Sequence, residues 1–576
     1  MNRLLRHLPL VCGFVVYTSA LMSGQTDVLT WHNNNWRDGL NSTETVLNQS
    51  NVNSAQFGKV CQAVVDGQIY AQPLVVSRGA GNNTVYIATM NDSVYEINGS
   101  NCSQIAQVSL LQANETAVGC AKVGGVHCWA LKPIIGILGT PVIDSTTNTM
   151  FLVSETESTA GACATGKQNS CFTHRLHALD LTTLAEKFGG PIDIAGSYEK
   201  VAFTSSNHIQ RPGLLLLPNT WQNGDSTVYI GFSEMDGTGV VGISIPRGWV
   251  FAFDAYNLAN APIVWSTTPA DEGGGIWMSG GGLAAGADSP GGDTYLYAVT
   301  GDGDFNVNTG GADYGDSFVK LTTNLTTVPN GYFTPYGQEC MDVQDEDFGS
   351  GGVMLIPDSG STYWAIAAGK DGNIYAMNRA NPGGYTPPTN SSCPATGTNA
   401  NQEYFKASPK AFYTTAGYWN SALFYSPMYS PLLKYGVSLA TPPTCHPYPV
   451  CQGQTAKSSA SFEYGPSLSI SSSGTKNGTA IVWVVDGNGW PSEGVAAPAP
   501  VVLYAYDAQH VTSPHTIPEL WNSSQCPTRD QTGNATKFVV PTIANGFVYL
   551  GTMDPTDSTA TRGELNVFGP TTATCD

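Results

Sequence analysis

Short apolar segments recur along the chain at intervals of about 70 residues. Each is about six residues long, and the clearest are TVYIAT (84–89), TMFLVS (149–154), TVYIGF (227–232), YLYAVT (295–300), YWAIAA (363–368), AIVWVV (480–485) and FVYLGT (547–552). After each comes a segment that alternates apolar and polar residues, such as SVYEIN (93–98), RLHALD (175–180) and NIYAMN (373–378). Alternation with a period of two is typical of half-buried antiparallel strands.

A third, turn-initiated strand precedes each pair, as in GTPVID (139–144) and GGVMLI (351–356). Seven such units are clear, and YWNSALFYSP (418–427) with LLKYGVS (432–438) indicates an eighth, degenerate unit. We therefore expect an all-β fold, a single β-propeller of about eight four-stranded antiparallel blades, with seven blades as the alternative. The segment FGKVCQAVVDG (57–67) is expected to supply the last strand of the last blade and so close the ring without an exposed sheet edge. A solenoid would need polar caps at its ends, and the sequence has none.

The N-terminus has the pattern of a secretory signal. Arg3 and Arg6 precede an apolar run from Leu8 to Leu21, and small residues follow at Ser23 and Gly24. We expect residues 1–24 to be a signal peptide, residues 25–576 to form one propeller domain, and the protein to be secreted or periplasmic. No later stretch is apolar enough for a membrane anchor. The formal net charge is −20, without a basic stripe, which argues against nucleic acid as a partner.

Twelve of the 13 cysteines lie beyond the signal segment. Three pairs are close in sequence: Cys120 with Cys128, Cys163 with Cys171, and Cys445 with Cys451. In an exported chain these spacings favour local disulfides over zinc ligands. The pairing of the other six, Cys61, Cys102, Cys340, Cys393, Cys526 and Cys575, does not follow from the sequence.

Several motifs carry a resemblance to a known group of propellers. They include WHNNNWRDGLN (31–41), DGQIYAQPL (66–74), QRPGLLLL (210–217), GGGIWMSGGG (273–282), GSGGVMLIPD (349–358) and GKDGNIYAMNR (369–379). In these motifs the chain resembles the quinoprotein alcohol dehydrogenase-like, or PQQ-repeat, β-propellers, and among them a secreted bacterial branch without a settled activity. The resemblance implies a propeller fold and leaves a PQQ cofactor open.

The chain departs from that group at positions that matter for redox chemistry. PQQ alcohol dehydrogenases of similar fold carry a disulfide between adjacent cysteines over the cofactor, and this chain has no adjacent cysteines. Relatives in the branch often have histidine where this chain has Glu234, Met235 and Arg247. The absence of an adjacent cysteine pair does not support PQQ as a cofactor of this chain.

The segment DGDFNVNTGGADYGD (302–316) predicts a calcium site. Asp302, Asp304, Asn306, Asn308 and Asp313 alternate as oxygen donors among glycines, with a spacing close to an EF-hand loop. Val307 replaces the glycine that such a loop needs, so a turn capped by its own Asp and Asn side chains is the alternative.

Arg211, Trp277 and Lys370 are candidate cofactor-binding residues. Arg211 precedes a repeat-initiating strand, where propeller loops meet the central channel, and Lys370 lies in a tight turn between two strands. A cation there could hold a carboxylate or polarise a carbonyl, or it could brace a loop through a salt bridge. Glycines around Trp277 favour close packing of blades or of a flat ligand.

Two functions are compatible with these features. The first is a non-catalytic extracellular module that binds a carbohydrate, a protein or a small molecule, with calcium as a stabilising ion. The second is a quinoprotein-type oxidoreductase that acts on alcohols or sugars with PQQ and calcium. A propeller hosts unrelated functions, so the fold does not decide between them.

Overall fold

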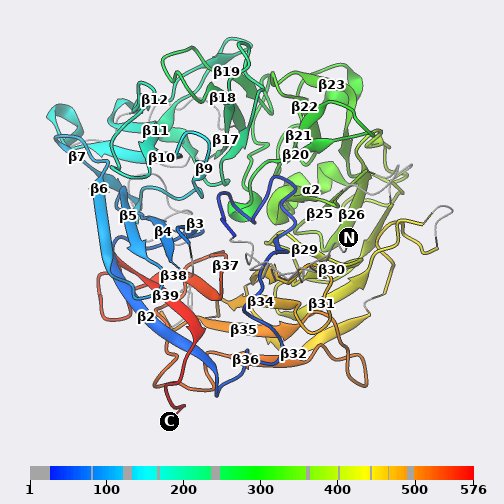
Figure 1. The fold of residues 1–576 in the computed structure, drawn as a ribbon. Coiled ribbons are helices and arrows are strands. Elements are labelled where there is room, and N and C mark those ends of the chain that lie inside the picture. Colours follow the sequence, from blue (N-terminus) through cyan, green and yellow to red (C-terminus); the bar gives the residue numbers. More distant parts are fainter. Residues whose placement is uncertain are drawn as a thin grey trace, which may run out of the picture.

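The computed structural model describes residues 26–79, 82–120, 131, 133–164, 169–234, 247–357, 363–399, 403–440, 444–453, 455–464, 466–488 and 498–575. These residues form a ring of eight antiparallel blades around a central axis (Figure 1), which confirms the predicted propeller and its preferred blade number. The signal segment 1–24 lies outside the described residues. None of the described helices is long and apolar enough to cross a membrane.

The first four blades follow the repeats in chain order. Their strands are β3 (Leu74–Ser77), β4 (Asn83–Ala88), β5 (Ser93–Asn98) and β6 (Gln104–Ser109) in blade 1; β9 (Val142–Asp144), β10 (Thr149–Ser158), β11 (Phe172–Asp180) and β12 (Ile192–Asp193) in blade 2; β16 (Leu215–Leu217), β17 (Thr227–Glu234), β18 (Trp249–Asp254) and β19 (Ile263–Ser266) in blade 3; and β20 (Ala284–Ala287), β21 (Thr294–Val299), β22 (Phe318–Thr322) and β23 (Thr327–Thr334) in blade 4.

The last four blades include the degenerate unit and the closing strand. Their strands are β24 (Val353–Leu355), β25 (Trp364–Ala368), β26 (Asn373–Asn378) and β28 (Glu403–Lys406) in blade 5; β29 (Gly417–Trp419), β30 (Ala422–Tyr425), β31 (Ser430–Gly436) and β32 (Ala456–Phe462) in blade 6; β33 (Ser467–Ser471), β34 (Ile481–Asp486), β35 (Val502–Asp507) and β36 (Glu519–Asn522) in blade 7; and β37 (Thr542–Ala544), β38 (Phe547–Met553), β39 (Arg562–Pro570) and β2 (Phe57–Asp66) in blade 8. The predicted eighth unit is thus confirmed as blade 6.

Short elements decorate this ring. They are β1 (Leu40–Asn41), β7 (Glu115–Gly119), β8 (Ile134–Ile135), β13 (Ser197–Tyr198), β14 (Val201–Ala202), β15 (His208–Ile209), β27 (Gly384–Tyr385), the helix α2 (Gln338–Gln344), and 3₁₀ turns at Gly161–Ala164, Asn169–Cys171, Ser205–Asn207, Met278–Gly280, Val307–Thr309 and Phe348–Gly351. The apolar core is divided among the interfaces between neighbouring blades, because each sheet buries both of its faces against the next.

The ring closes through the N-terminal strand. Strand β2 pairs antiparallel with β39, from Phe57 opposite Pro570 to Asp66 opposite Arg562. Blade 8 therefore combines three strands from the C-terminal end of the chain with one from the N-terminal end, as the sequence predicted. This pairing removes an exposed edge at β39.

The segment from Val28 to Asn41, which we call the axial segment, crosses the centre of the ring. Its backbone pairs with the first strands of successive blades: the N–H groups of Val75, Ile143, Ala285, Leu355, Tyr418 and Ile470 donate to the carbonyls of Val28, Leu29, Asn35, Trp36, Asp38 and Gly39. One stretch of chain thus contacts six blades and runs along their inner strands (Figure 1). The motif in this stretch is visible in the sequence, but its position in the ring was not predicted.

Five disulfides join described residues, and two of them lie at the closure of the ring. Cys61–Cys102 links β2 of blade 8 to the β5–β6 turn of blade 1, and Cys526–Cys575 ties the C-terminal end to the loop after β36. Cys340–Cys393 is the third long-range bridge. Of the predicted local bridges, Cys163–Cys171 and Cys445–Cys451 are present. Cys120 is disulfide-bonded, and Cys128 lies outside the described residues.

Removing the bridge at the ring closure should weaken the fold more than removing a local one. The Cys61–Cys102 bridge spans 41 residues and the Cys445–Cys451 bridge spans 6. The chain-entropy model predicts that the first bridge stabilises the fold by about 4 kcal/mol and the second by about 2 kcal/mol. We expect Cys61→Ser/Cys102→Ser to lower the urea midpoint more than Cys445→Ser/Cys451→Ser does. Equal shifts would contradict the role given to the closure.

Candidate functional site

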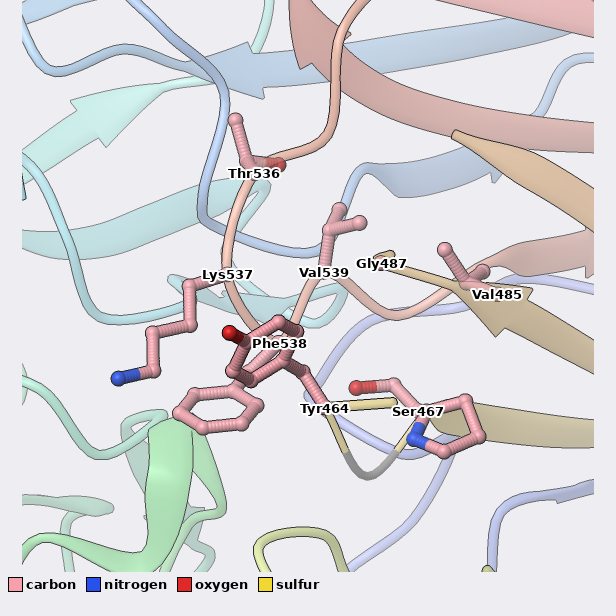
Figure 2. A pocket seen from close by; sticks show the side chains of 9 residues that line it. Tyr464, Ser467, Val485, Gly487, Thr536, Lys537, Phe538 and Val539 are labelled. Atoms are coloured by element: carbon pink, nitrogen blue, oxygen red, sulfur yellow. The ribbon is translucent and has the colours of Figure 1, made fainter. Parts of the chain in front are cut away.

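A pocket lies at the axis of the propeller, where blades 7 and 8 meet. We call it the axial pocket, and it is lined by Tyr464, Pro466, Ser467, Val485, Gly487, Thr536, Lys537, Phe538 and Val539. It contains about 280 Å³ of empty space, including the part open to solvent. Lys537, Phe538 and Tyr464 project to the same side of it (Figure 2). A second pocket of about 220 Å³ shares Ser467 with it and is lined by Trp31 and His32 of the axial segment.

Two cations from other blades lie near the pocket residues Lys537 and Phe538 without lining the pocket themselves. The Arg211 guanidinium and the Lys537 ammonium each lie 5.2 Å from the centroid of the Phe538 ring. Tyr413 stacks on the same ring, with centroids 5.9 Å apart. Lys370 is near enough to act electrostatically on Lys537. Arg211, Tyr413 and Lys537 precede the first strands of blades 3, 6 and 8, and Lys370 lies in the β25–β26 turn of blade 5. The first strands of the blades face the axis, so these side chains meet there. We call Arg211, Lys370 and Lys537 the cation cluster.

Arg211 is buried without an anionic partner. Its side chain is 6% exposed, and within the described part of the chain no carboxylate or carbonyl oxygen accepts a hydrogen bond from its guanidinium. Its contacts are the Phe538 ring and an electrostatic interaction with Tyr70. Burial lowers the pKa of Arg211 to about 10, so the group stays charged at neutral pH. A buried charge without a counter-ion is costly, which makes an anion the natural complement of this site.

Lys370, by contrast, is neutralised by protein carboxylates. Its Nζ lies 2.5 Å from Asp345 Oδ1 and 2.6 Å from Asp347 Oδ2. Burial alone would lower the pKa of Lys370, but the two carboxylates raise it above its usual value. Burial would likewise raise the pKa of Asp347, and Lys370 together with the Asp302 N–H holds it below the usual value. The two carboxylates differ in exposure, because Asp347 is buried in this ion pair while Asp345 is exposed.

Trp277 lies in the glycine-rich stretch 273–282. Its indole packs at the edge of an apolar group that contains Tyr70, Cys120 and Ile209. Close packing explains at least one of the surrounding glycines: Gly273 has φ +78°, and a Cβ there would lie 2.5 Å from the Gly303 Cα. This geometry agrees with the blade-packing interpretation of the motif.

The predicted calcium loop is largely occupied by its own hydrogen bonds. Asp313 accepts the Ala270 N–H at 3.0 Å and hydrogen-bonds with Asn306, and Asp304 accepts the Glu272 N–H at 3.2 Å. Asn308 is exposed on a 3₁₀ turn. Among the described residues, the carboxylates close enough together to share an ion are those of Asp302, Asp345 and Asp347. A calcium ion bound by the five loop residues stays a prediction.

Arg211 and Lys370 were predicted from the sequence, whereas Lys537, Phe538 and Tyr413 were not. Lys537 and Phe538 precede β37 much as Arg211 precedes β16. That shared position before a repeat-initiating strand is the signal that could have found them. Of the positions where relatives often have histidine, Arg247 is buried and donates to the Thr268 carbonyl at 2.7 Å, and Met235 lies outside the described residues.

Comparisons with known proteins identify the fold of the chain but not its activity. No protein-family profile and no curated sequence matches the chain. Among solved structures, a quinohemoprotein alcohol dehydrogenase from Comamonas testosteroni has a TM-score of 0.55 at 13% identity, over 95% of this chain and 81% of that one. A europium-containing methanol dehydrogenase has a TM-score of 0.52 at 12% identity, over 94% and 98%. The chain therefore has the propeller fold of the quinoprotein alcohol dehydrogenases, as the resemblance predicted. Sequence identities this low do not show that the chain shares their activity.

Proposed function

We propose that this protein is an extracytoplasmic binding module whose axial pocket holds a small molecule with a carboxylate group. The observation that supports the proposal is Arg211, a buried guanidinium with no acceptor among the described residues. The Phe538 ring, which Arg211 contacts, and the Tyr464 ring both line the pocket and suit a flat apolar body on the same ligand. The disulfides support an oxidising compartment.

Benzoate is a suitable probe because it combines a carboxylate with one aromatic ring. We expect benzoate to bind wild-type protein and the uncharged analogue benzamide to bind at least about tenfold more weakly, since a hydrogen bond to a charged group contributes about 1.5–3 kcal/mol. Isothermal titration calorimetry on the folded chain measures both. Equal affinity for the acid and the amide would overturn the proposal.

Arg211→Gln should weaken benzoate binding by about 10- to 100-fold, because it removes the charge while keeping a donor. Arg78→Gln is the matched control, since Arg78 is exposed on blade 1 and should leave binding unchanged. The unfolding midpoint of Arg211→Gln should not fall, because the substitution removes a buried, uncompensated charge. Undiminished benzoate affinity in this variant would place the anion elsewhere.

A quinoprotein oxidoreductase is the second candidate. The shared fold and the cations at the axis favour it, since PQQ is itself an acidic, flat quinone. One observation weighs against it: the chain has no adjacent cysteines, which the PQQ alcohol dehydrogenases carry over the cofactor. Reconstitution with PQQ and calcium, followed by dye reduction on alcohols and sugars, separates the two functions. Turnover would favour the oxidoreductase.

A further inference from the structure

Aromatic rings continue from the axial pocket to the surface of the protein. Tyr464 and Phe538 line the pocket and point to the same side of it (Figure 2). The ring of Tyr429, in the turn between β30 and β31, lies 6.2 Å from the Tyr464 ring between centroids. Tyr413, which stacks on Phe538, also acts electrostatically on Tyr429. We call Tyr413, Tyr429, Tyr464 and Phe538 the aromatic group.

Tyr429 is the outermost member of the aromatic group. It is 50% exposed, and within the described part of the chain no other Phe, Tyr or Trp is as exposed. Tyr413, Tyr464 and Phe538 are half-buried. An exposed ring that is held against a second ring at the edge of a pocket offers a ligand both an apolar face and a phenol. The group therefore extends the pocket outward.

Cations lie on the aromatic group at its inner and outer ends. The Arg211 guanidinium is 5.2 Å from the Phe538 centroid, and the Lys410 ammonium is 5.5 Å from the Tyr429 centroid. Lys410 is exposed, and none of the described carboxylates forms an ion pair with it. The chain has a net charge of −20, so two cations without a protein counter-ion on one group of rings mark a place that favours an anionic ligand.

A sugar acid has the chemical features that this arrangement recognises. One face of a pyranose ring presents C–H groups that pack on an aromatic ring, and a carboxylate on the sugar pairs with a cation. The hydroxyls at the rim of the sugar can hydrogen-bond with the tyrosine phenols and with Ser467, which lines the pocket. An aromatic hydrocarbon makes none of these hydrogen bonds. Charge and ring chemistry together therefore favour an acidic carbohydrate.

We propose that the ligand is an acidic oligosaccharide whose terminal uronate enters the axial pocket and whose second sugar ring stacks on Tyr429. Arg211 holds the carboxylate of the terminal uronate, and Lys410 attracts that of the second. The inference rests on the proposed carboxylate pocket and names its ligand class, because the flat body beside the carboxylate is then the C–H face of a pyranose ring. Binding is non-covalent throughout.

Isothermal titration calorimetry of the full chain with three sugars tests this inference. The probes are digalacturonate, its monomer galacturonate, and galactobiose, which is the neutral disaccharide of the same linkage. We expect digalacturonate to bind at least about tenfold more tightly than galacturonate, because only the disaccharide reaches Tyr429 and Lys410. Galactobiose should bind at least about tenfold more weakly than digalacturonate, since it lacks both carboxylates. Added salt should weaken the binding of digalacturonate.

Substitutions at exposed positions make the result specific. Tyr429→Ala should weaken digalacturonate binding by about tenfold and leave galacturonate and benzoate unchanged, whereas Tyr429→Phe retains the ring and should bind nearly as wild type does. Lys410→Gln should weaken digalacturonate binding by about two- to fivefold. Glu463→Gln should strengthen it, because Glu463 is an exposed carboxylate that acts electrostatically on Tyr429. Lys476→Gln, in the exposed β33–β34 turn at the other end of the blades, is the matched control and should change nothing.

The outcomes separate this inference from the proposed function. If benzoate binds through Arg211 but digalacturonate binds no more tightly than galacturonate, or Tyr429→Ala has no effect, the oligosaccharide is wrong and the carboxylate pocket stands. If neither benzoate nor digalacturonate binds, both are wrong. Digalacturonate binding that depends on Tyr429 but is insensitive to Arg211→Gln would overturn the placement of the terminal uronate in the pocket.

Discussion

Replacing Arg37 with methionine should lower the free energy of unfolding by about 3–5 kcal/mol. The Arg37 side chain is fully buried in the axial segment. Its Nε donates to the Leu283 carbonyl at 2.9 Å, and its Nη2 donates to the Leu214 carbonyl at 3.2 Å. Nη1 donates within the segment, to Thr30 Oγ1 and the Trp31 carbonyl. One guanidinium therefore joins the axial segment to blades 3 and 4.

The expected loss comes from the carbonyl groups that the substitution leaves unpaired. Methionine fills much of the arginine's volume but donates no hydrogen bond, so buried carbonyls lose their partner. Urea unfolding followed by tryptophan fluorescence measures the effect. Arg78→Met is the matched control and should change stability by less than about 0.5 kcal/mol, since Arg78 is exposed. A shift no larger than that of the control would mean that the axial segment does not hold the blades together.

Replacing Lys370 with methionine should cost a similar amount, about 3–5 kcal/mol near neutral pH. The substitution leaves the buried Asp347 carboxylate without its cation, while the Gly301–Asp302 backbone still packs against it. Lys370→Arg should retain most of the stability. Lys370→Met/Asp347→Asn should recover much of the loss, because the remaining amide is neutral and can still accept the Asp302 N–H.

The pH dependence of this pair has a defined sign. In wild-type protein the pKa of Asp347 is held below its usual value, so the pair contributes stability above about pH 4 and loses it as the pH falls further. In Lys370→Met the buried carboxylate has no cation and its pKa should rise, so protonation relieves the cost. The stability difference between wild type and Lys370→Met should therefore shrink from pH 7 to pH 4. A constant or growing difference would show that Lys370 acts through packing alone.

Local patterns predicted the ring because each blade is specified by its own strands. The apolar six-residue segments became the second strands of the blades, and even the irregular 418–438 stretch forms blade 6. The closing strand was predictable because residues 57–67 have strand character and the last repeat lacks a fourth strand. Both features can be recognised without knowledge of any distant contact.

The site was less predictable because it depends on contacts between distant blades. Arg211 and Phe538 are separated by more than half of the chain, and only the closed ring brings them together. Nothing local in the sequence indicated that Asp347 would be buried in an ion pair with Lys370. Likewise, no local pattern shows that residues 28–41 cross the axis, since their partners lie in six blades.

The proposal that the axial pocket binds the carboxylate of a ligand is tested most directly by a crystal structure of the protein grown with benzoate. The account predicts density for one benzoate in the axial pocket, with its carboxylate within hydrogen-bond distance of the Arg211 guanidinium and its ring against Phe538 or Tyr413. Arg211→Gln crystals grown in the same way should lack that density. A benzoate found only on the outer surface, or an Arg211 guanidinium paired with a carboxylate of the protein itself, would contradict it.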